Sequence, residues 1–249
     1  MGSPGNRGLP SFSGQRSGKW LSLAVLFLVA LGGSWTPLLA ETEGEAPAFS
    51  DFDGWWKEYT DAAATARPAL VKKGTEFSQK RRDAMLKLIE SDPAAAIKKA
   101  FPEEYHSSLP KPIQPLVEAH IRGLAKLVVT KSKDGTADRR IIVEDQRWKA
   151  FLYGPRLELE SREEIPIHGV ALEDRIAVDG SPLERFPNRE SLLNLLRQGE
   201  GKKSCPICDE PGTIPTAVGD ILLWFDTQEH LDVCEKALIE KEASPDEES

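Results

Sequence analysis

The sequence predicts an α+β protein in which N-terminal helices precede a small antiparallel β-sheet or open barrel and a C-terminal knuckle of strands and a helix. Three observations support this class. Apolar residues recur at helical spacing in residues 41–110, and the period changes to two in residues 111–187. All three cysteines lie in residues 188–239, ahead of an acidic tail at 240–249 that we expect to be disordered.

Residues 1–40 have the composition of an export signal. Three basic residues, Arg7, Arg16 and Lys19, precede an apolar-rich run at 20–31, and Ala40 offers a small residue for cleavage. We therefore expect export to the periplasm or the cell exterior, with cleavage after Ala40. The mature chain would then have no integral membrane domain, whereas an uncleaved signal would anchor the chain to the membrane.

The charge of the mature chain argues against nucleic acid as a partner. Removing the three basic residues of the signal from the 32 in the chain leaves 29 Lys and Arg against 40 Asp and Glu, a net charge of −11. A surface of this sign repels phosphate backbones and anionic lipid.

The helical part begins with an aromatic stripe. Phe52, Trp55, Trp56 and Tyr59 follow the i, i+3, i+4, i+7 spacing of one helix face. The simpler interpretation is that this face packs on the next helix. The alternative is a partner-binding stripe, because aromatic residues are common interface anchors.

Two more helices are expected before the sheet. One covers residues 72–90, with the basic cluster at 80–82 in solvent. A shorter one starts at Pro93, with Asp92 as its N-cap, and ends near Ala100.

The middle of the chain contains strand-like segments separated by turn signals. His168 lies at the start of one of them, where we expect a structural role for it, because no nucleophile accompanies it. The expected strands are 124–130, 140–144, 148–153, 167–172 and 175–178.

A linker helix at 191–198 leads into the cysteine-rich segment, whose spacing is Cys205-x2-Cys208-x21-His230-x3-Cys234. Ligands three apart suit a tight knuckle, and ligands four apart share one helix face. Between them, residues 220–225 are strand-like, and Asp226 to Glu229 form a capping box. This order of knuckle, strand and helix predicts a treble-clef-like ββα knuckle.

Cys205, Cys208, His230 and Cys234 are the candidate metal ligands, with zinc the expected ion and copper the other candidate. A structural zinc site contributes on the order of 10 kcal/mol, against roughly 3 to 4 kcal/mol for a disulfide closing a loop of this length. Two alternatives remain open. Cys205 or Cys208 pairs with Cys234 in a disulfide, or all three cysteines are thiols.

Two family resemblances accompany these motifs. The segment from Cys208 to Cys234 resembles the C-x19–22-C-x3-C pattern of TRASH and YHS-type metal-binding modules, with His230 in place of a cysteine. Residues 81–237 resemble an accessory module of uncharacterised role in large exported bacterial proteins, above all through the segment 165–172. That resemblance implies a non-catalytic envelope module.

Known catalytic motifs are absent from the sequence, including H-E-x-x-H, G-x-S-x-G and G-x-G-x-x-G. We therefore expect an exported, non-catalytic binding or interaction module with a structural or sensing metal, whose partner is another envelope protein. One alternative is a thiol-disulfide oxidoreductase that uses Cys205 and Cys208. The other is a folded spacer with a structural disulfide.

Overall fold

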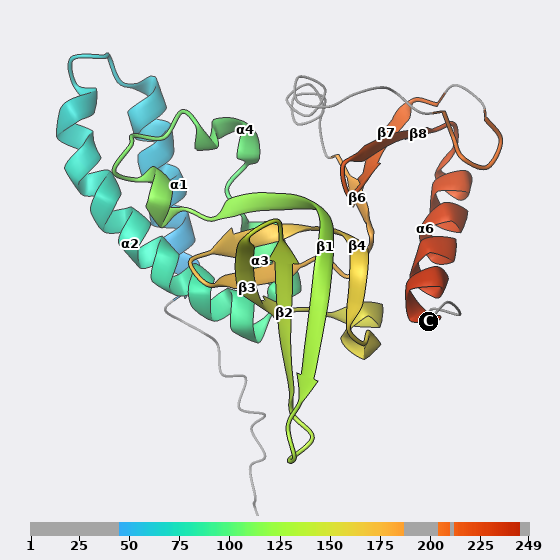
Figure 1. The fold of residues 1–249 in the computed structure, drawn as a ribbon. Helices are drawn as coiled ribbons and strands as arrows, with labels where there is room; N and C mark the ends of the chain where they lie inside the picture. The colour runs from blue at the N-terminus through green and yellow to red at the C-terminus, as the bar shows by residue number, and fades with distance from the viewer. Residues whose placement is uncertain (1–44, 187–203, 210–211, 245–249) are drawn as a thin grey trace, which may run out of the picture. The chain divides into compact units, whose positions relative to one another are not determined.

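The structure is a computed structural model that describes residues 45–186, 204–209 and 212–244 (Figure 1). All of them belong to one compact unit, Glu41–Ser249. It is an α+β fold in which N-terminal helices accompany a closed five-stranded barrel, followed by a separate three-stranded antiparallel sheet and a C-terminal helix. The predicted linker helix at 191–198 lies outside the described residues.

The first helices confirm that the aromatic stripe belongs to the core. Helix α1 (Glu45–Asp61) lies beside α2 (Arg67–Ser91), and Phe52 and Trp55 are fully buried between them and the following segment. The indole of Trp55 donates a hydrogen bond of 2.9 Å to the carbonyl of Leu70. Gly74 on α2 makes this packing possible, because a Cβ atom there would overlap the Trp55 ring.

Helix α3 (Pro93–Lys99) starts as predicted. The carboxylate of Asp92 accepts a hydrogen bond of 2.9 Å from the backbone N–H of Ala95, so it caps the helix. Two short helical turns then lead to the barrel: α4 (Glu103–His106) and the 3-10 turn η1 (Gln114–Leu116).

The expectation that the basic cluster at 80–82 lies in solvent is wrong for Arg81, which is 1% exposed. Its guanidinium pairs with the buried carboxylate of Glu118 and donates to the carbonyl of Lys99. The same carboxylate accepts from the backbone N–H of Phe101. The charge is tolerated in the core because a buried carboxylate and a backbone carbonyl contact it.

The barrel has the strand order β1-β2-β3-β5-β4 and closes between β4 and β1. Four neighbouring pairs are antiparallel, as predicted, whereas β3 and β5 are parallel. A closed ring of five strands requires at least one parallel pair, because directions cannot alternate around an odd number. The strands are β1 (Ala119–Lys131), β2 (Ala137–Val143), β3 (Gln146–Phe151), β4 (Arg162–Leu172) and β5 (Arg175–Val178), with the 3-10 turn η2 (Gly154–Glu158) between β3 and β4.

Strand β1 is long because it serves two neighbours. Its first half pairs with β4 and its second half with β2, with an irregular register between Ala125 and Leu127. This five-stranded Greek-key order is that of OB-fold barrels, a topology that supports many unrelated functions. Apolar residues fill the interior, among them Leu127, Ile141 and Ile176, and α2 and α3 pack on β4 and β5 outside.

The C-terminal part contains a sheet of β6 (Leu183–Arg185), β7 (Ile214–Val218) and β8 (Ile221–Phe225), followed by α6 (Gln228–Ala243). β6 precedes the predicted boundary at residue 187, yet it pairs with β7. Helix α6 extends into the segment predicted as a disordered tail. Within the described ranges, no helix has the length and hydrophobicity needed to cross a membrane.

Buried ionic contacts join α6 to the barrel. Arg156 of η2 is 1% exposed and forms two hydrogen bonds of 3.0 and 2.6 Å with the carboxylate of Glu242. It also donates to the backbone carbonyls of Asp179 and Pro166. The guanidinium of Arg156 therefore ties the last turns of α6 to two parts of the barrel region, and Arg162 of β4 adds bonds to the carbonyls of Lys241 and Ser244.

Candidate metal centre

The knuckle is a tight turn from Cys205 to Asp209. The backbone N–H of Asp209 donates a hydrogen bond of 2.9 Å to the carbonyl of Cys205, and Asp209 adopts the left-handed φ of 58°. The turn directs the backbone N–H groups of Ile207 and Cys208 towards the sulfur of Cys205. Such a turn favours a thiolate, because two backbone donors already point at its position.

Helix α6 supplies the opposite side of the site. Its N-cap is Thr227, whose hydroxyl accepts a hydrogen bond of 3.2 Å from the backbone N–H of His230. The N-cap therefore lies one residue after the predicted Asp226, and the predicted capping box does not form, because the residue three positions after Thr227 is His230 and not a Glu or Gln. This shift leaves the Asp226 carboxylate near the His230 ring, where its Oδ1 lies 2.7 Å from Nδ1.

Four potential ligand atoms converge between the knuckle and the helix. One atom each from Cys205, Cys208, Asp226 and His230 lies within 4.8 Å of the other three. The Cys205 sulfur is 3.8 Å from His230 Nδ1. In a tetrahedral zinc site, a sulfur and a nitrogen ligand lie about 3.6 Å apart, so this spacing fits one ion between them.

The charges of these groups are coupled. Burial disfavours the Cys205 thiolate, but hydrogen bonds from the backbone of Cys208 and Ile207 and from the Cys208 and His230 side chains lower its pKa. The hydrogen bond with Asp226 raises the pKa of His230, against a smaller opposing effect of burial. The Cys205 thiolate and the Asp226 carboxylate thus both lie beside the proton of the His230 ring. A metal cation bound here would replace that proton.

Burial opposes the ionised form of Asp226, yet hydrogen bonds from His230 and Cys208 lower its pKa. A carboxylate in this position can coordinate the ion directly. Alternatively, it accepts a hydrogen bond from Nδ1 and holds the imidazole in one orientation while Nε2 coordinates the ion, as carboxylates commonly do around zinc.

Cys234, the remaining predicted ligand, is not in the group of four. Its side chain packs partly buried against the hydrophobic cluster that contains Cys205, Phe225 and Leu231. Burial and the negative charge of Cys205 raise the pKa of Cys234, so the neutral thiol is favoured. The effect of Cys205 also shows that the Cys234 thiol lies near the group of four. All three cysteines fall within the described residues, and the structure joins none of them in a disulfide.

The arrangement of His230 differs from that of a catalytic triad. In a triad, the two ring nitrogens face different partners, one the nucleophile and the other the carboxylate. Here the same atom, Nδ1, faces both the Cys205 sulfur and the Asp226 carboxylate. Ligand atoms converging on one point are typical of a metal site, whereas a proton relay passes through the ring.

The spacing of the cysteines and the histidine predicted three of the four converging residues, whereas Asp226 was predicted only as a helix cap. A signal was present, because Asp226 precedes His230 by four residues and carboxylates are zinc ligands. Comparison of the chain with family models, curated proteins and solved structures gives no match. The two resemblances described above therefore rest on their motifs alone.

Proposed function

We propose that the chain is an exported, non-catalytic binding module of the bacterial envelope, built around a C-terminal zinc centre. The observation that carries the metal proposal is the convergence of Cys205, Cys208, Asp226 and His230 within 4.8 Å. Two thiolates, an imidazole and a carboxylate match the ligand preference of zinc, and copper is the alternative that elemental analysis distinguishes.

The proposed role of the ion is structural. Four protein ligands leave no open coordination position, whereas catalytic zinc sites retain one for water or substrate. The chain order of knuckle, β7–β8 hairpin and α6 supports a treble-clef-like module. Its own apolar core is small, so metal coordination would supply much of its stability.

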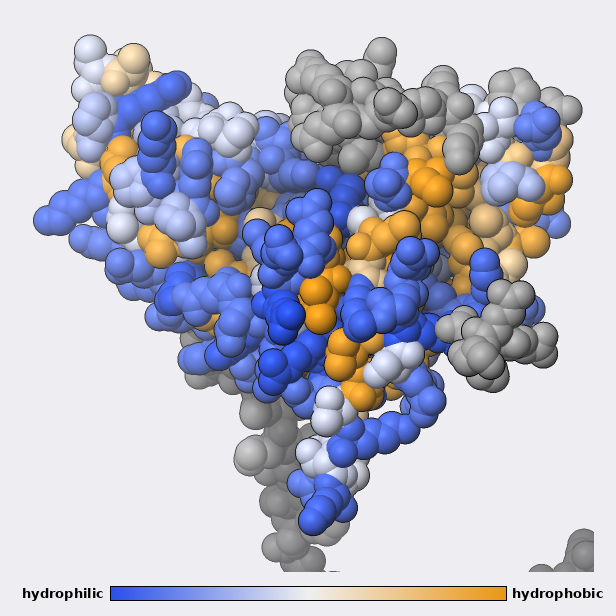
Figure 2. Space-filling model, in the orientation of Figure 1, coloured by the Kyte–Doolittle hydropathy of each residue, from blue (hydrophilic) through white to orange (hydrophobic). Residues whose placement is uncertain are grey.

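The binding role of this module is supported by its surface. Ile207, Ile221 and Val233 are each more than 40% exposed, three of the six exposed large hydrophobic residues among those described. In Figure 2, hydrophobic residues gather around β6 to β8 and α6, whereas the helices α1 and α2 are largely hydrophilic on this face. Clustered apolar exposure is typical of interaction surfaces, and another envelope protein is the proposed partner.

A thiol-disulfide oxidoreductase is the second candidate, because the pKa of Cys205 is lowered, as in reactive C-x-x-C pairs. The surroundings of the pair favour metal binding. Redox pairs commonly begin a helix, whereas Cys205 and Cys208 lie in a turn followed by Asp209 in a left-handed conformation. His230 and Asp226 also converge on these thiols, which a redox pair does not require.

The test is elemental analysis of the mature protein after export to an oxidising compartment, with thiols counted under denaturing conditions. We expect about one zinc per chain and three titratable thiols. Cys208→Ser should abolish metal binding. Loss of one ligand or orienting carboxylate in Asp226→Asn should weaken zinc affinity about 10 to 100-fold.

Cys234→Ser is the matched variant that decides the fourth ligand. Full zinc content in this variant would support Asp226, whereas loss of zinc with Asp226→Asn unaffected would support the predicted Cys3His set. Absence of metal together with a single titratable thiol would refute the zinc proposal and establish a disulfide. Insulin reduction that depends on Cys205 in the metal-free protein would favour the oxidoreductase.

A further inference from the structure

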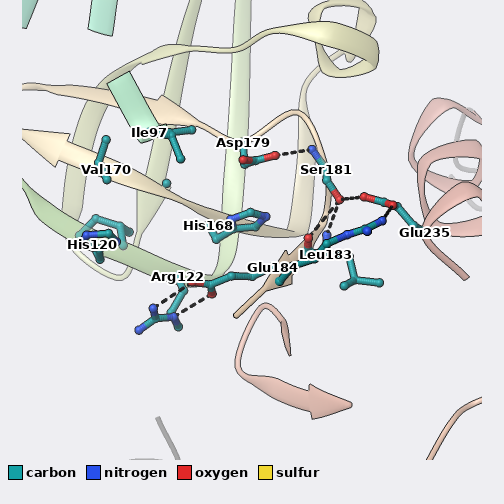
Figure 3. Close-up of a pocket in the computed structure, with 13 residues that line it drawn as sticks. Ile97, His120, Arg122, His168, Val170, Asp179, Ser181, Leu183, Glu184 and Glu235 are labelled. Carbon is teal, nitrogen blue, oxygen red and sulfur yellow. Dashed lines mark hydrogen bonds and ion pairs between the residues drawn. The ribbon is translucent and has the colours of Figure 1, made fainter. Parts of the chain in front are cut away.

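Two of the cavities in the described part of the chain differ in how their polar groups are used. The first, of about 390 Å³, forms around His168, where β1 and β4 meet α3, β6 and α6 (Figure 3). Its polar side chains contact one another: in Figure 3, Arg122 pairs with Glu184, and the Ser181 hydroxyl donates to the Glu235 carboxylate. These contacts join the barrel to β6 and α6, which is a structural role.

The second cavity, of about 480 Å³, opens at one end of the barrel. It lies where β1 and β3 begin and β4 ends, beside η1 and the last residue of α4. Apolar side chains form much of its wall, among them Val117, Ile121, Trp148, Ala171 and Leu172. Ile121, Trp148 and Ala171 also belong to the cluster that fills the barrel, so the cavity reaches the barrel interior. Its volume is within the range of small-molecule sites.

Trp148 carries a polar group that the fold leaves unpaired. The side chain is 8% exposed. Its indole N–H donates to no acceptor among the described residues, and it is not one of the unpaired atoms that solvent cannot reach. Because the barrel encloses the rest of the ring, the N–H is reached through the cavity that the ring lines. A buried Trp usually pairs its N–H, so this donor indicates a place for an acceptor from a ligand.

Gln114 of η1 offers the complementary group in the same wall. Its Nε2 donates to the carbonyls of Ser107 and Leu109, at 3.3 and 2.9 Å, which uses both amide hydrogens. Its Oε1 accepts from no residue in the described ranges, and solvent reaches it. The cavity wall therefore presents a donor on Trp148 and an acceptor on Gln114.

The charges of the wall favour an uncharged ligand. Glu173 is the acidic residue among the described residues that line the cavity, and its carboxylate pairs with Arg82, which is not in the wall. Within those lining residues there is no lysine or arginine. An anion would meet no permanent cation, and a cation would compete with Arg82 for Glu173. A charge buried here would therefore lack a partner, which is costly.

We propose that this cavity binds a small neutral amide that carries an apolar group. The amide carbonyl would accept from the Trp148 N–H, and the amide N–H would donate to Oε1 of Gln114. The apolar group would lie against Val117, Ile121 and Leu172. An amide combines an acceptor and a donor without a net charge, as the wall requires. The proposal concerns barrel residues alone, so it does not depend on the proposed metal centre.

The test is an NMR titration of the mature protein with phenylacetamide, observing the indole N–H signals. The Trp148 signal is identified by its absence from Trp148→Phe. We expect saturable binding that moves this signal, and no comparable response to phenylacetate, which has nearly the same shape and a negative charge. Trp148→Phe keeps an aromatic ring but removes the donor, so its affinity, measured from the backbone signals, should be about fivefold weaker.

A second variant blocks the cavity from an exposed position, where folding is not at risk. Ala119 is exposed and lines the cavity on the same face of β1 as Ile121, so a larger side chain there would occupy the cavity. We expect Ala119→Phe to abolish phenylacetamide binding. Ala137→Phe is the matched control, because Ala137 pairs with Lys131 at the other end of β1, and it should bind like the parent protein.

Three results would overturn the proposal. Phenylacetamide could give no saturable response or leave the Trp148 signal unmoved. Phenylacetate could bind equally well, which would remove the preference for a neutral amide. Folded Ala119→Phe could bind phenylacetamide as tightly as the parent protein, which would place the ligand elsewhere; this variant decides the question even if Trp148→Phe does not fold.

Discussion

The barrel with its helices and the C-terminal module are stabilised in different ways. The barrel region contains three clusters of buried hydrophobic residues, including Leu127, Ile141 and Met85. Among the described residues, the C-terminal cluster contains four buried residues, and one of them is Cys205. A region with so little apolar burial needs another source of stability, because conformational entropy opposes the ordering of every residue. The difference explains why the candidate metal ligands occur in the smaller region.

The two regions also use buried ion pairs differently. Arg81 and Glu118 lie wholly within the helix and barrel region, where they join α2 to the segment before β1. Arg156 and Glu242 instead join the barrel to the last turns of α6. The first pair is therefore part of one core, and the second connects the two regions.

Metal removal should produce the largest effect and should separate the two regions. We expect chelation of the proposed zinc, or Cys208→Ser, to abolish amide protection in β7, β8 and α6, because a structural zinc site contributes on the order of 10 kcal/mol. Strands β1 to β5 should retain their protection, since their core contains none of the proposed ligands. Hydrogen-exchange mass spectrometry measures both regions at once, and simultaneous loss of protection in the barrel would contradict the comparison.

Breaking the ion pair inside the barrel region should come next. Arg81→Met leaves the Glu118 carboxylate buried without its partner, so we expect a loss of about 3 to 5 kcal/mol in the free energy of unfolding. Arg82→Met is the matched control, because its partners Asp83 and Glu173 are exposed, and it should cost less than about 1 kcal/mol. Urea denaturation measures the free energy of unfolding of both variants. Equal losses in the two would show that burial of the Arg81–Glu118 pair does not increase its contribution to stability.

Breaking the pair that connects the regions should have a smaller and more local effect. Glu242→Gln leaves the charge of Arg156 uncompensated, although its bonds to two backbone carbonyls remain. We expect the free energy of local opening of α6 to fall by about 3 kcal/mol, at the lower end of the range for buried pairs. This loss would be measured as faster amide exchange in α6. Glu240→Gln on the same helix breaks only an exposed pair with Lys236 and should leave exchange unchanged. Unchanged exchange in Glu242→Gln would mean that α6 does not depend on this contact.

The smallest effect concerns pH and the half-buried His168. Burial holds its pKa below the ordinary value of 6.5, so the unfolded chain binds more protons than the folded one in this range. The contribution of His168 to the free energy of unfolding is therefore fully present above about pH 6.5. It falls as the pH drops towards the folded pKa, by at most about 1.4 kcal/mol per pH unit. His168→Phe should remove this slope in urea titrations between pH 5 and pH 7, roughly the range around that value. If the slope is unchanged in His168→Phe, the pH dependence of stability comes from other titratable groups.

Local patterns in the sequence predicted the elements that depend on neighbours along the chain. The helical spacing of the aromatic residues located α1, and Asp92 followed by Pro93 located the start of α3. Strand β5 was predicted with its observed bounds. These predictions succeed because capping and periodic burial involve residues only a few positions apart.

Within the candidate site, spacing alone predicted that Cys205, Cys208 and His230 share one centre, and the structure brings them together. The inclusion of Asp226 depended on which residue caps α6, and a shift of one residue changed its role from cap to potential ligand. Cys234 has suitable spacing, yet its thiol packs into the hydrophobic cluster. Whether it coordinates the ion stays a prediction.

The sequence by itself determined the α+β class, the helices α1 to α3, the five barrel strands, strand β8 and helix α6, and three of the four residues that converge in the candidate metal centre, because each depends on local spacing. Only the tertiary structure decided that the barrel closes with one parallel pair, that Arg81 is buried, and that a cavity forms around His168. These features join residues far apart in the chain. Their free energy depends on burial and on the charges that folding brings together, which no local pattern records.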